Sequence, residues 1–165
     1  MVTDRDFTLS RIFDAPRDRV FKAWTDSLQV ARWWGPKGFS NPVCELDVRP
    51  GGAHRIVMRG PDGVDYPVKG FYREVVENER LVLTNDLSEN PDSWHDIVAP
   101  GRDKSKGRPA FASIETVTFE DAGSGKTRVT IHMVFERAAD RDALVKTGMN
   151  EGWSQSLDRL AELLA

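Results

Sequence analysis

Apolar and polar side chains alternate along most of the chain, as they do in strands that bury one face of a sheet. A first strand is predicted at residues 5–14, and six further segments show the same alternation: 43–48, 53–60, 65–77, 80–87, 112–121 and 126–136. Most of them are joined by short turns rich in glycine, proline or asparagine, and strands joined by such turns must run antiparallel. The pattern therefore predicts one antiparallel sheet of six to seven strands.

Helical spacing replaces this alternation in two parts of the chain. Pro16 suits the first turn of a short helix, and Asp26-Ser27 end that helix and cap a second one, which reaches Trp33-Trp34. From Ala138 to the C-terminus the spacing is helical throughout, with one broad apolar face made of Val145, Met149, Trp153, Leu157, Leu160 and Leu164. Only this last helix is large enough to cover the sheet. The predicted fold class is α+β, a curved sheet wrapped around a long C-terminal helix, with two short helices after the first strand.

The segment 88–111 fits neither pattern. It is polar, contains Pro91, Pro100 and Pro109, and shows no sustained period. Long loops of this kind are often functional lids or disordered. Its lone tryptophan, Trp94, could cover a cavity mouth, contact a partner protein or anchor the loop locally. No internal repeat is visible, so residues 1–165 are predicted to form a single domain.

Charge and cysteine content narrow the classes of partner. A net charge of −3 and a pI near 5.6 argue against a nucleic acid or an anionic membrane. Cys44 is the single cysteine, which excludes an internal disulfide and a cysteine-based zinc cluster. The three histidines lie on separate segments without a carboxylate at ligand spacing, so neither a metal nor a cofactor is expected.

No apolar run is long enough to span a membrane and residues 1–6 are polar, so we expect a cytoplasmic protein.

Trp33 and Trp34 stand side by side at the end of the second short helix. Neighbouring helical positions lie about 100° apart, so the two indoles cannot share one face. Gly35-Pro36 end the helix there, which sets the direction of both rings. We expect one indole to seat the short helices against the core and the other to border a cavity. Gly148 and Gly152 in the C-terminal helix indicate a close backbone contact or a cavity wall.

A cavity between sheet and C-terminal helix would be lined by inward-facing residues of both. The predicted ligand-binding residues are Trp33, Trp34, His54, Ile56, Met58, Val117, Phe119, Met149 and Trp153. His54 is their polar member, and it would orient a ligand carbonyl, act as a general base near pH 7, or be hydrogen-bonded within the cavity wall. His132 is expected at the surface, and so is His95 unless its loop folds down.

Several short motifs carry a resemblance to a known family. They run from Ala15 to Trp24, Trp33 to Pro36, Glu45 to Gly52, Met58 to Gly63, Gly70 to Glu74, Gly148 to Trp153 and Leu157 to Leu164. With the order of elements, they resemble the START-like (SRPBCC, helix-grip) superfamily, which includes birch-pollen-allergen-like and polyketide-cyclase-like proteins. Within it, the chain is most similar to bacterial relatives of the C-terminal domain of the heat-shock protein 90 ATPase activator. The likeness covers nearly the whole chain except residues 88–111.

The resemblance implies a helix-grip fold and leaves several functions open, because such relatives bind small molecules, catalyse reactions or bind proteins. The favoured function is binding of a hydrophobic or aromatic small molecule in the cavity. One alternative is a cofactor-free enzyme of the cyclase or hydratase type, with His54 or a tyrosine transferring a proton. Another is a protein-interaction or stress-response module that contacts a chaperone partner, by analogy, through Trp94 and the basic run Arg102–Arg108. An exposed edge strand would also permit a homodimer.

Overall fold

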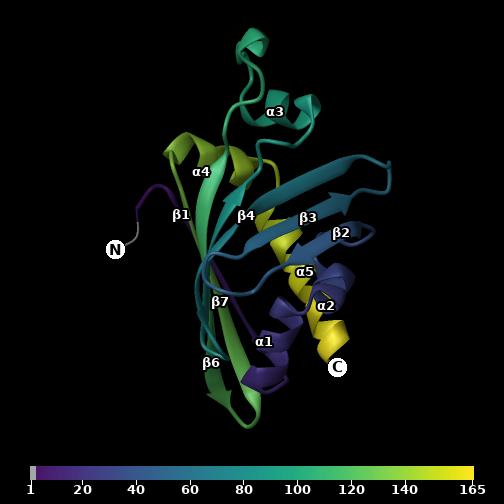
Figure 1. Ribbon diagram of the computed structural model, residues 1–165, viewed down its shortest axis with the longest axis vertical. Helices are drawn as coiled ribbons and strands as arrows, with labels where there is room; N and C mark the ends of the chain where they lie inside the picture. The colour runs from purple at the N-terminus through teal and green to yellow at the C-terminus, as the bar shows by residue number, and fades with distance from the viewer. Residues whose placement is uncertain (1–2) are drawn as a thin grey trace.

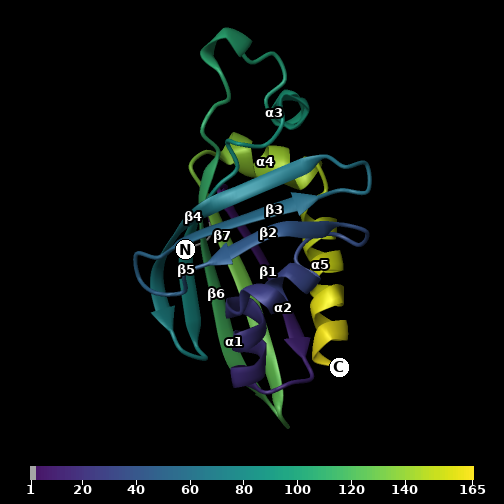
Figure 2. The same cartoon turned by 45° about the vertical axis from the view of Figure 1, so that its right-hand side comes forward.

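Seven antiparallel strands form one continuous sheet in the computed structural model, which describes residues 3–165 (Figures 1 and 2). The order across the sheet is β1-β7-β6-β5-β4-β3-β2, so β2 to β7 form a meander and β1 pairs with the last strand. The strands are β1 (Asp6–Phe13), β2 (Ser40–Leu46), β3 (Ala53–Arg59), β4 (Asp65–Val76), β5 (Arg80–Asp86), β6 (Ala112–Gly123) and β7 (Lys126–Phe135). The predicted α+β fold is confirmed.

Three helices pack on the same side of this sheet: α1 (Arg17–Thr25), α2 (Ser27–Trp33) and α5 (Met149–Leu164) (Figures 1 and 2). Asp26 joins α1 to α2, and its side chain accepts a hydrogen bond from the backbone N–H of Leu28 at 3.0 Å. This N-cap satisfies a donor that α2 cannot pair internally, as the sequence predicted. The two short helices therefore meet end to end and close one end of the curved sheet.

The C-terminal helical region is broken, contrary to the prediction that it is helical throughout. Its first part, α4 (Ala138–Lys146), ends before Gly148, and α5 starts at Met149. Gly148 has a φ of +95°, in the left-handed region that residues with a side chain rarely adopt. The glycine therefore marks a turn between two helices, so that Val145 belongs to α4 and only α5 lies along the sheet.

The segment 88–111 also holds more structure than its sequence predicted. It contains α3 (Asp92–Val98) and a 3₁₀ turn (Lys104–Lys106), and it projects beyond the end of the sheet (Figure 1). A helix of seven residues is too short to produce a visible period. His95 is fully buried, and its Nε2 lies 2.9 Å from the carbonyl oxygen of Ser88. The segment thus folds down at this point, and the default expectation of an exposed His95 is wrong.

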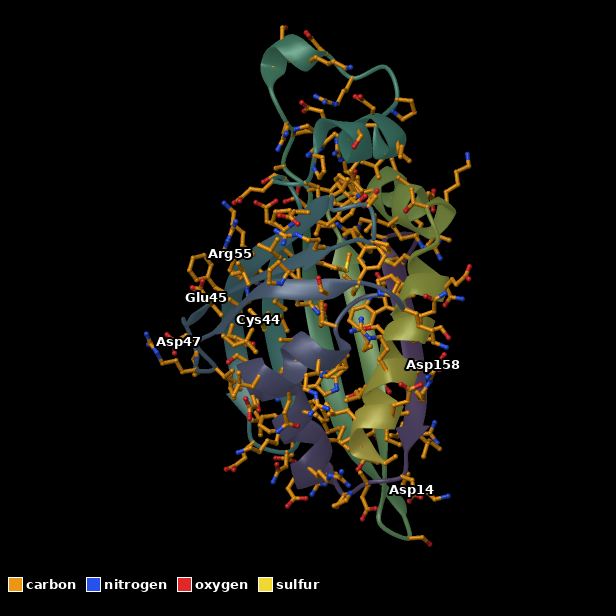
Figure 3. The ribbon with its side chains drawn as sticks, turned by 90° about the vertical axis from the view of Figure 1, so that its right-hand side faces the viewer. Asp14, Cys44, Glu45, Asp47, Arg55 and Asp158 are labelled. Atoms are coloured by element: carbon orange, nitrogen blue, oxygen red, sulfur yellow. The ribbon has the colours of Figure 1, made fainter. Side chains whose placement is uncertain are left out.

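Strand β2 shows how the alternation sorts side chains between core and solvent. Glu45 of β2 and Asp47 just after it point away from the sheet, whereas Asp158 of α5 forms an ion pair with Arg11 of β1 at 2.6 Å (Figure 3). Cys44 and Leu46 instead pack against a small buried cluster formed by Val30, Ile56 and Val68. Burial raises the pKa of the Cys44 thiol to about 11, so it stays protonated at neutral pH.

Four of the five tryptophans form one cluster where α1, α2 and α5 meet. The ring centroids of Trp24 and Trp33 lie 4.6 Å apart, those of Trp33 and Trp34 5.6 Å, and those of Trp34 and Trp153 5.3 Å. Trp153 also stacks on Trp24 at 6.1 Å, which closes the ring of contacts. Trp33 is fully buried and donates its indole N–H to the carbonyl of Ala23 at 2.9 Å. It therefore packs the two short helices against each other and against the core, as expected for one indole of the pair.

Polar side chains of α5 hold the end of α2 in place. Arg159 donates from Nη1 to three carbonyls, those of Trp34 (3.0 Å), Gly35 (2.9 Å) and Pro36 (3.1 Å). Its Nη2 donates to the carbonyl of Arg32 at 3.0 Å. Ser156 Oγ accepts from the N–H of Gly35 at 3.1 Å. A cation at the C-terminus of a helix satisfies orphan carbonyls and interacts favourably with the helix dipole.

Removing this contact should destabilise the protein. Arg159→Ala is expected to lower the free energy of unfolding by about 1–3 kcal/mol, because several charge-assisted hydrogen bonds are lost together. Urea unfolding at neutral pH measures the change. Arg17→Ala, at an exposed arginine, is the matched control and should stay within about 0.5 kcal/mol of wild type. Equal stabilities of the two variants would contradict the role given to Arg159.

Candidate functional site

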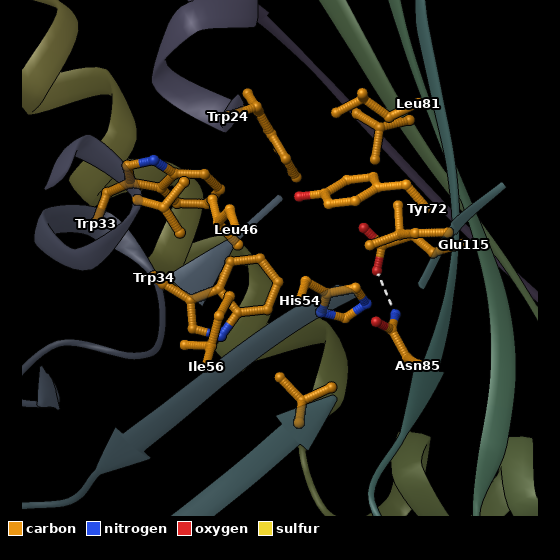
Figure 4. A pocket seen from close by; sticks show the side chains of 14 residues that line it. Trp24, Trp33, Trp34, Leu46, His54, Ile56, Tyr72, Leu81, Asn85 and Glu115 are labelled. Atoms are coloured by element: carbon orange, nitrogen blue, oxygen red, sulfur yellow. Dashed lines mark hydrogen bonds between the residues drawn. The ribbon is translucent and has the colours of Figure 1, made fainter. Parts of the chain in front are cut away.

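A cavity of about 280 Å³ lies between the inner face of the sheet and α5. Its walls are mostly apolar and come from the sheet, the end of α2, segment 88–111 and the α4–α5 region: Trp34, Met58, Val68, Leu87, Trp94, Met133, Leu144, Met149 and Trp153. A smaller cavity of about 30 Å³ lies beside it, deeper under α1 and α2 (Figure 4). Trp34, Val68, Asn85 and Glu115 line both, so the two spaces meet at these side chains.

The larger cavity opens toward the surface next to α3 and α4. A broad surface hollow between these helices shares Met58, Tyr66, Trp94 and Thr147 with the cavity wall. Trp94 packs edge-on against Phe111 at 5.1 Å and against His95 at 5.0 Å. It therefore anchors α3 locally and at the same time forms part of the wall at the cavity mouth.

A buried carboxyl group stands at the point where the two cavities meet. Glu115 lies on β6, is 2% exposed, and accepts a hydrogen bond from Asn85 Nδ2 at 2.9 Å (Figure 4). Asn85 reaches it because β5 and β6 pair in register, with Asn85 opposite Ser113 and Leu83 opposite Glu115. Burial raises the pKa of Glu115 to about 7, while the Asn85 hydrogen bond works in the opposite direction. At neutral pH this carboxyl group can therefore gain or lose a proton.

His54 lies in the wall of the smaller cavity and is held by the backbone. Its Nε2 lies 2.7 Å from the carbonyl oxygen of Thr84, so Nε2 carries the proton and donates it. The contact spans two strands and passes Gly70 of β4, where a Cβ would lie 1.8 Å from the Thr84 oxygen and 2.8 Å from Nε2. Burial lowers the pKa of His54, and the Thr84 hydrogen bond opposes that shift. The neutral ring is thus favoured, which matches the interpretation of a hydrogen-bonded histidine within the wall.

Tyr72 and Trp24 add polar groups to the smaller cavity. The Tyr72 hydroxyl points toward Trp24 (Figure 4). Burial, together with the nearby Glu115 and Cys44, raises the pKa of the Tyr72 phenol, so it remains a neutral donor. The indole N–H of Trp24 is buried and has no hydrogen-bond partner among residues 3–165. This end of the site is consequently rich in groups that can donate a hydrogen bond.

Most of the predicted ligand-binding residues face one of the two cavities. Trp34, Met58, Met149 and Trp153 line the larger one. Those that line the smaller one are Trp33, Trp34, His54, Ile56 and Val117. Phe119 lines neither cavity, because it lies one step further along the inner face of β6 and packs edge-on with Phe21 (5.2 Å) and Trp24 (6.1 Å). Trp34 is half-buried and lines both cavities, whereas the fully buried Trp33 lines only the smaller one.

The sequence-based prediction missed Glu115, Asn85 and Ser113. A signal for Glu115 was present, because it shares the inward-facing parity of β6 with Ser113, Val117 and Phe119. An acidic residue at a core-facing strand position must be neutral or paired, which makes it a marker of a functional site. Asn85 carries no comparable signal, since its role depends on the pairing of β5 with β6.

These features place the chain in the START-like (SRPBCC) superfamily of α+β domains. The family model described as "Activator of Hsp90 ATPase homolog 1-like protein" matches residues 14–165, and the chain belongs to this family. The resemblance inferred from the sequence is thereby confirmed.

Solved structures of bacterial proteins share the fold over nearly the whole chain. A protein from Nitrosomonas europaea is 27% identical, with 99% of this chain and 96% of that chain covered and a TM-score of 0.78. One from Chromobacterium violaceum is 28% identical, with 98% of both chains covered and a TM-score of 0.76. A Silicibacter pomeroyi protein named AHSA1 is 25% identical, with 96% of both chains covered and a TM-score of 0.72. No curated protein matches this chain.

Across residues 3–165, no three histidine, cysteine or acidic side chains are grouped so that they could hold a metal ion. No helix in the same range is long and apolar enough to cross a membrane. Glu115 and the neutral groups around it supply the polar side chains of the candidate site.

The buried carboxyl group should give the protein a distinctive dependence of stability on pH. The pKa of Glu115 is about 7 in the folded state and is near its ordinary value of 4.5 when the chain is unfolded. The wild-type free energy of unfolding should therefore be highest, relative to Glu115→Gln, below pH 4.5. It should fall as the pH rises to about 7 and stay level above that, with a total change on the order of 3 kcal/mol.

Urea unfolding of both proteins between pH 4.5 and pH 8.5 measures this difference. Glu120→Gln, at an exposed position of the same strand, is the control and should follow the wild type at every pH. Parallel curves for wild type and Glu115→Gln would show that Glu115 is not a buried titrating group.

Proposed function

We propose that the chain binds a hydrophobic or aromatic small molecule in the cavity between the sheet and α5. The observation that carries this proposal is the cavity itself, about 280 Å³ of space with mainly apolar walls and an opening beside Trp94. Binding sites for small molecules are typically concave, mostly apolar and supplied with a few polar groups. Burial of apolar ligand surface contributes roughly 25 cal/mol per Å² before the costs of ordering the ligand and the protein.

The polar groups of the site would orient the bound molecule. Glu115, Asn85 and Ser113 face the larger cavity from two adjacent strands, while Met149 and Trp153 face it from α5. A ligand would thus meet hydrogen-bonding groups at the sheet and apolar contacts at the helix. This division supports a ligand with one polar end and an apolar body.

Gly152 offers a way to fill the cavity without disturbing the fold. It lines the cavity from α5, and a Cβ at this position would meet only Pro36 Cγ, at 3.8 Å. Gly152→Leu should occupy the cavity and weaken binding of a neutral aromatic probe, 2-(2-naphthyl)ethanol, by about tenfold or more. Gly152→Ala is the matched control, since alanine favours the helix by about 1 kcal/mol and leaves most of the space open.

Probe affinity can be measured by isothermal titration calorimetry. Native mass spectrometry of the purified wild-type protein reports in addition any small molecule that copurifies with it. A wild-type protein that carries no ligand and binds neither the neutral probe nor the corresponding amine, 2-(2-naphthyl)ethylamine, would overturn the proposed function. Equal probe affinities of Gly152→Leu and Gly152→Ala would place binding elsewhere on the molecule.

One observation favours a second candidate function, a cofactor-free enzyme that transfers a proton in the same cavity. Glu115 faces the cavity and has a pKa of about 7, close to the optimum for a general acid or base near neutral pH. His54 is less suited than the sequence indicated, because its Nε2 proton is already donated to Thr84. Turnover of a bound ligand that is lost in Glu115→Gln, with ligand affinity retained, would support the enzyme. Ligand binding without turnover in the wild-type protein would exclude it for that ligand.

A further inference from the structure

We propose that the natural ligand of the cavity is an amphipathic amine, whose protonated nitrogen is recognised by Glu115 and whose apolar body lies among the aromatic side chains of the larger cavity. This inference rests on the proposed function and specifies the chemical class of its ligand. It depends on the charges that face the cavity, on the aromatic groups that line it, and on the hydrogen bonds still open at Glu115.

The charged group of the site is acidic and has no basic side chain beside it. Among residues 3–165, Glu115 is the only carboxyl group that lines either cavity, and no lysine or arginine of that range lines them. The other titratable groups that line the two cavities are His54 on β3 and Tyr66 and Tyr72 on β4. The side chains that α5 contributes, Met149, Trp153 and Ser156, carry no charge. An anionic ligand would thus meet a carboxyl group and no counter-cation, whereas an ammonium group would gain its only charged partner.

The aromatic lining favours a cation as well. Trp34, Tyr66, Trp94 and Trp153 all line the larger cavity. The face of an aromatic ring attracts a cation held within about 6 Å, and an indole does so most strongly. Carboxylate and aromatic rings together are the groups that recognise organic ammonium ions, and the rings also provide the apolar surface that an amine's hydrocarbon body needs.

Glu115 has hydrogen-bonding capacity left for a ligand. Its Oε1 accepts from Asn85 Nδ2, and no partner of Oε2 is found among residues 3–165. In the ionised state the group is an acceptor only, so it matches an ammonium group, which is a donor only. A buried carboxylate is costly without a partner, and an ion pair with a bound ammonium group offsets that cost. Binding of the amine should therefore drive the release of a proton from Glu115.

Three probes that share a naphthalene body test this inference: 2-(2-naphthyl)ethylamine, 2-(2-naphthyl)ethanol and 2-naphthylacetate. Titration calorimetry of the wild-type protein at pH 8 should show the amine binding at least about tenfold more tightly than the alcohol, and the carboxylate more weakly than both. Glu115→Gln should abolish the preference for the amine, so that the amine and the alcohol bind this variant with affinities within about threefold of each other. Glu120→Gln should leave all three affinities unchanged.

A second measurement needs no variant. In the wild-type protein the Kd of the amine should rise by about tenfold between pH 8 and pH 6, because Glu115 takes up a proton over this range. Titrations in two buffers of different ionisation enthalpy should show proton release on amine binding at pH 6. His54 could contribute to the pH dependence, and Glu115→Gln separates the two because it retains His54.

The outcomes distinguish failure of the amine inference from failure of the proposed function. If the alcohol binds and the amine binds no more tightly, or if the carboxylate binds best, the inference about the amine is overturned and the proposed function stands. If neither alcohol nor amine binds the wild-type protein, the proposed function falls and the inference with it. Preference for the amine that persists in Glu115→Gln, or proton uptake instead of release, would also overturn the role given to Glu115.

Discussion

The contact between α5 and the end of α2 is the constraint on which the rest of the structure depends. Trp24, Trp33, Trp34 and Trp153 pack their rings against one another there, and Arg159 satisfies the carbonyls that α2 leaves unpaired. This contact fixes α5 at one end of the curved sheet. Gly148 turns the chain at the start of α5, and the larger cavity lies between this part of α5 and the sheet.

The cavity is unusual in placing an ionisable group in an otherwise neutral wall. Glu115 is buried without a cation, so part of the folding free energy is lost whenever it ionises. A residue that only filled space could be apolar at no such cost. In the proposed binding site, the carboxyl group, its Asn85 partner and the surrounding aromatic rings would recognise the ligand, and ligand binding would offset the cost of burying the charge.

Much of the fold could be predicted from the sequence because its signals are local. Strand alternation, the Asp26 cap and the Trp33-Trp34-Gly35-Pro36 end of α2 each depend on a few neighbouring residues. The site was predicted less well. Trp34, Met149 and Trp153 could be assigned to a cavity from their spacing, whereas the partners of His54 and Glu115 lie 30 residues away along the chain, on other strands. The burial of His95 and the break at Gly148 escaped prediction because helical spacing reports neither tertiary contacts nor a single residue's φ.

The sequence by itself determined the antiparallel sheet, the order of the elements and which side chains face inward, since periodicity and turn residues encode these directly. Only the tertiary structure decided which inward-facing side chains pack and which border open space. That choice depends on strand register and on how closely α5 approaches the sheet. Glu115 and Phe119 illustrate this, because they share one face of β6, yet the first borders a cavity and the second fills the core.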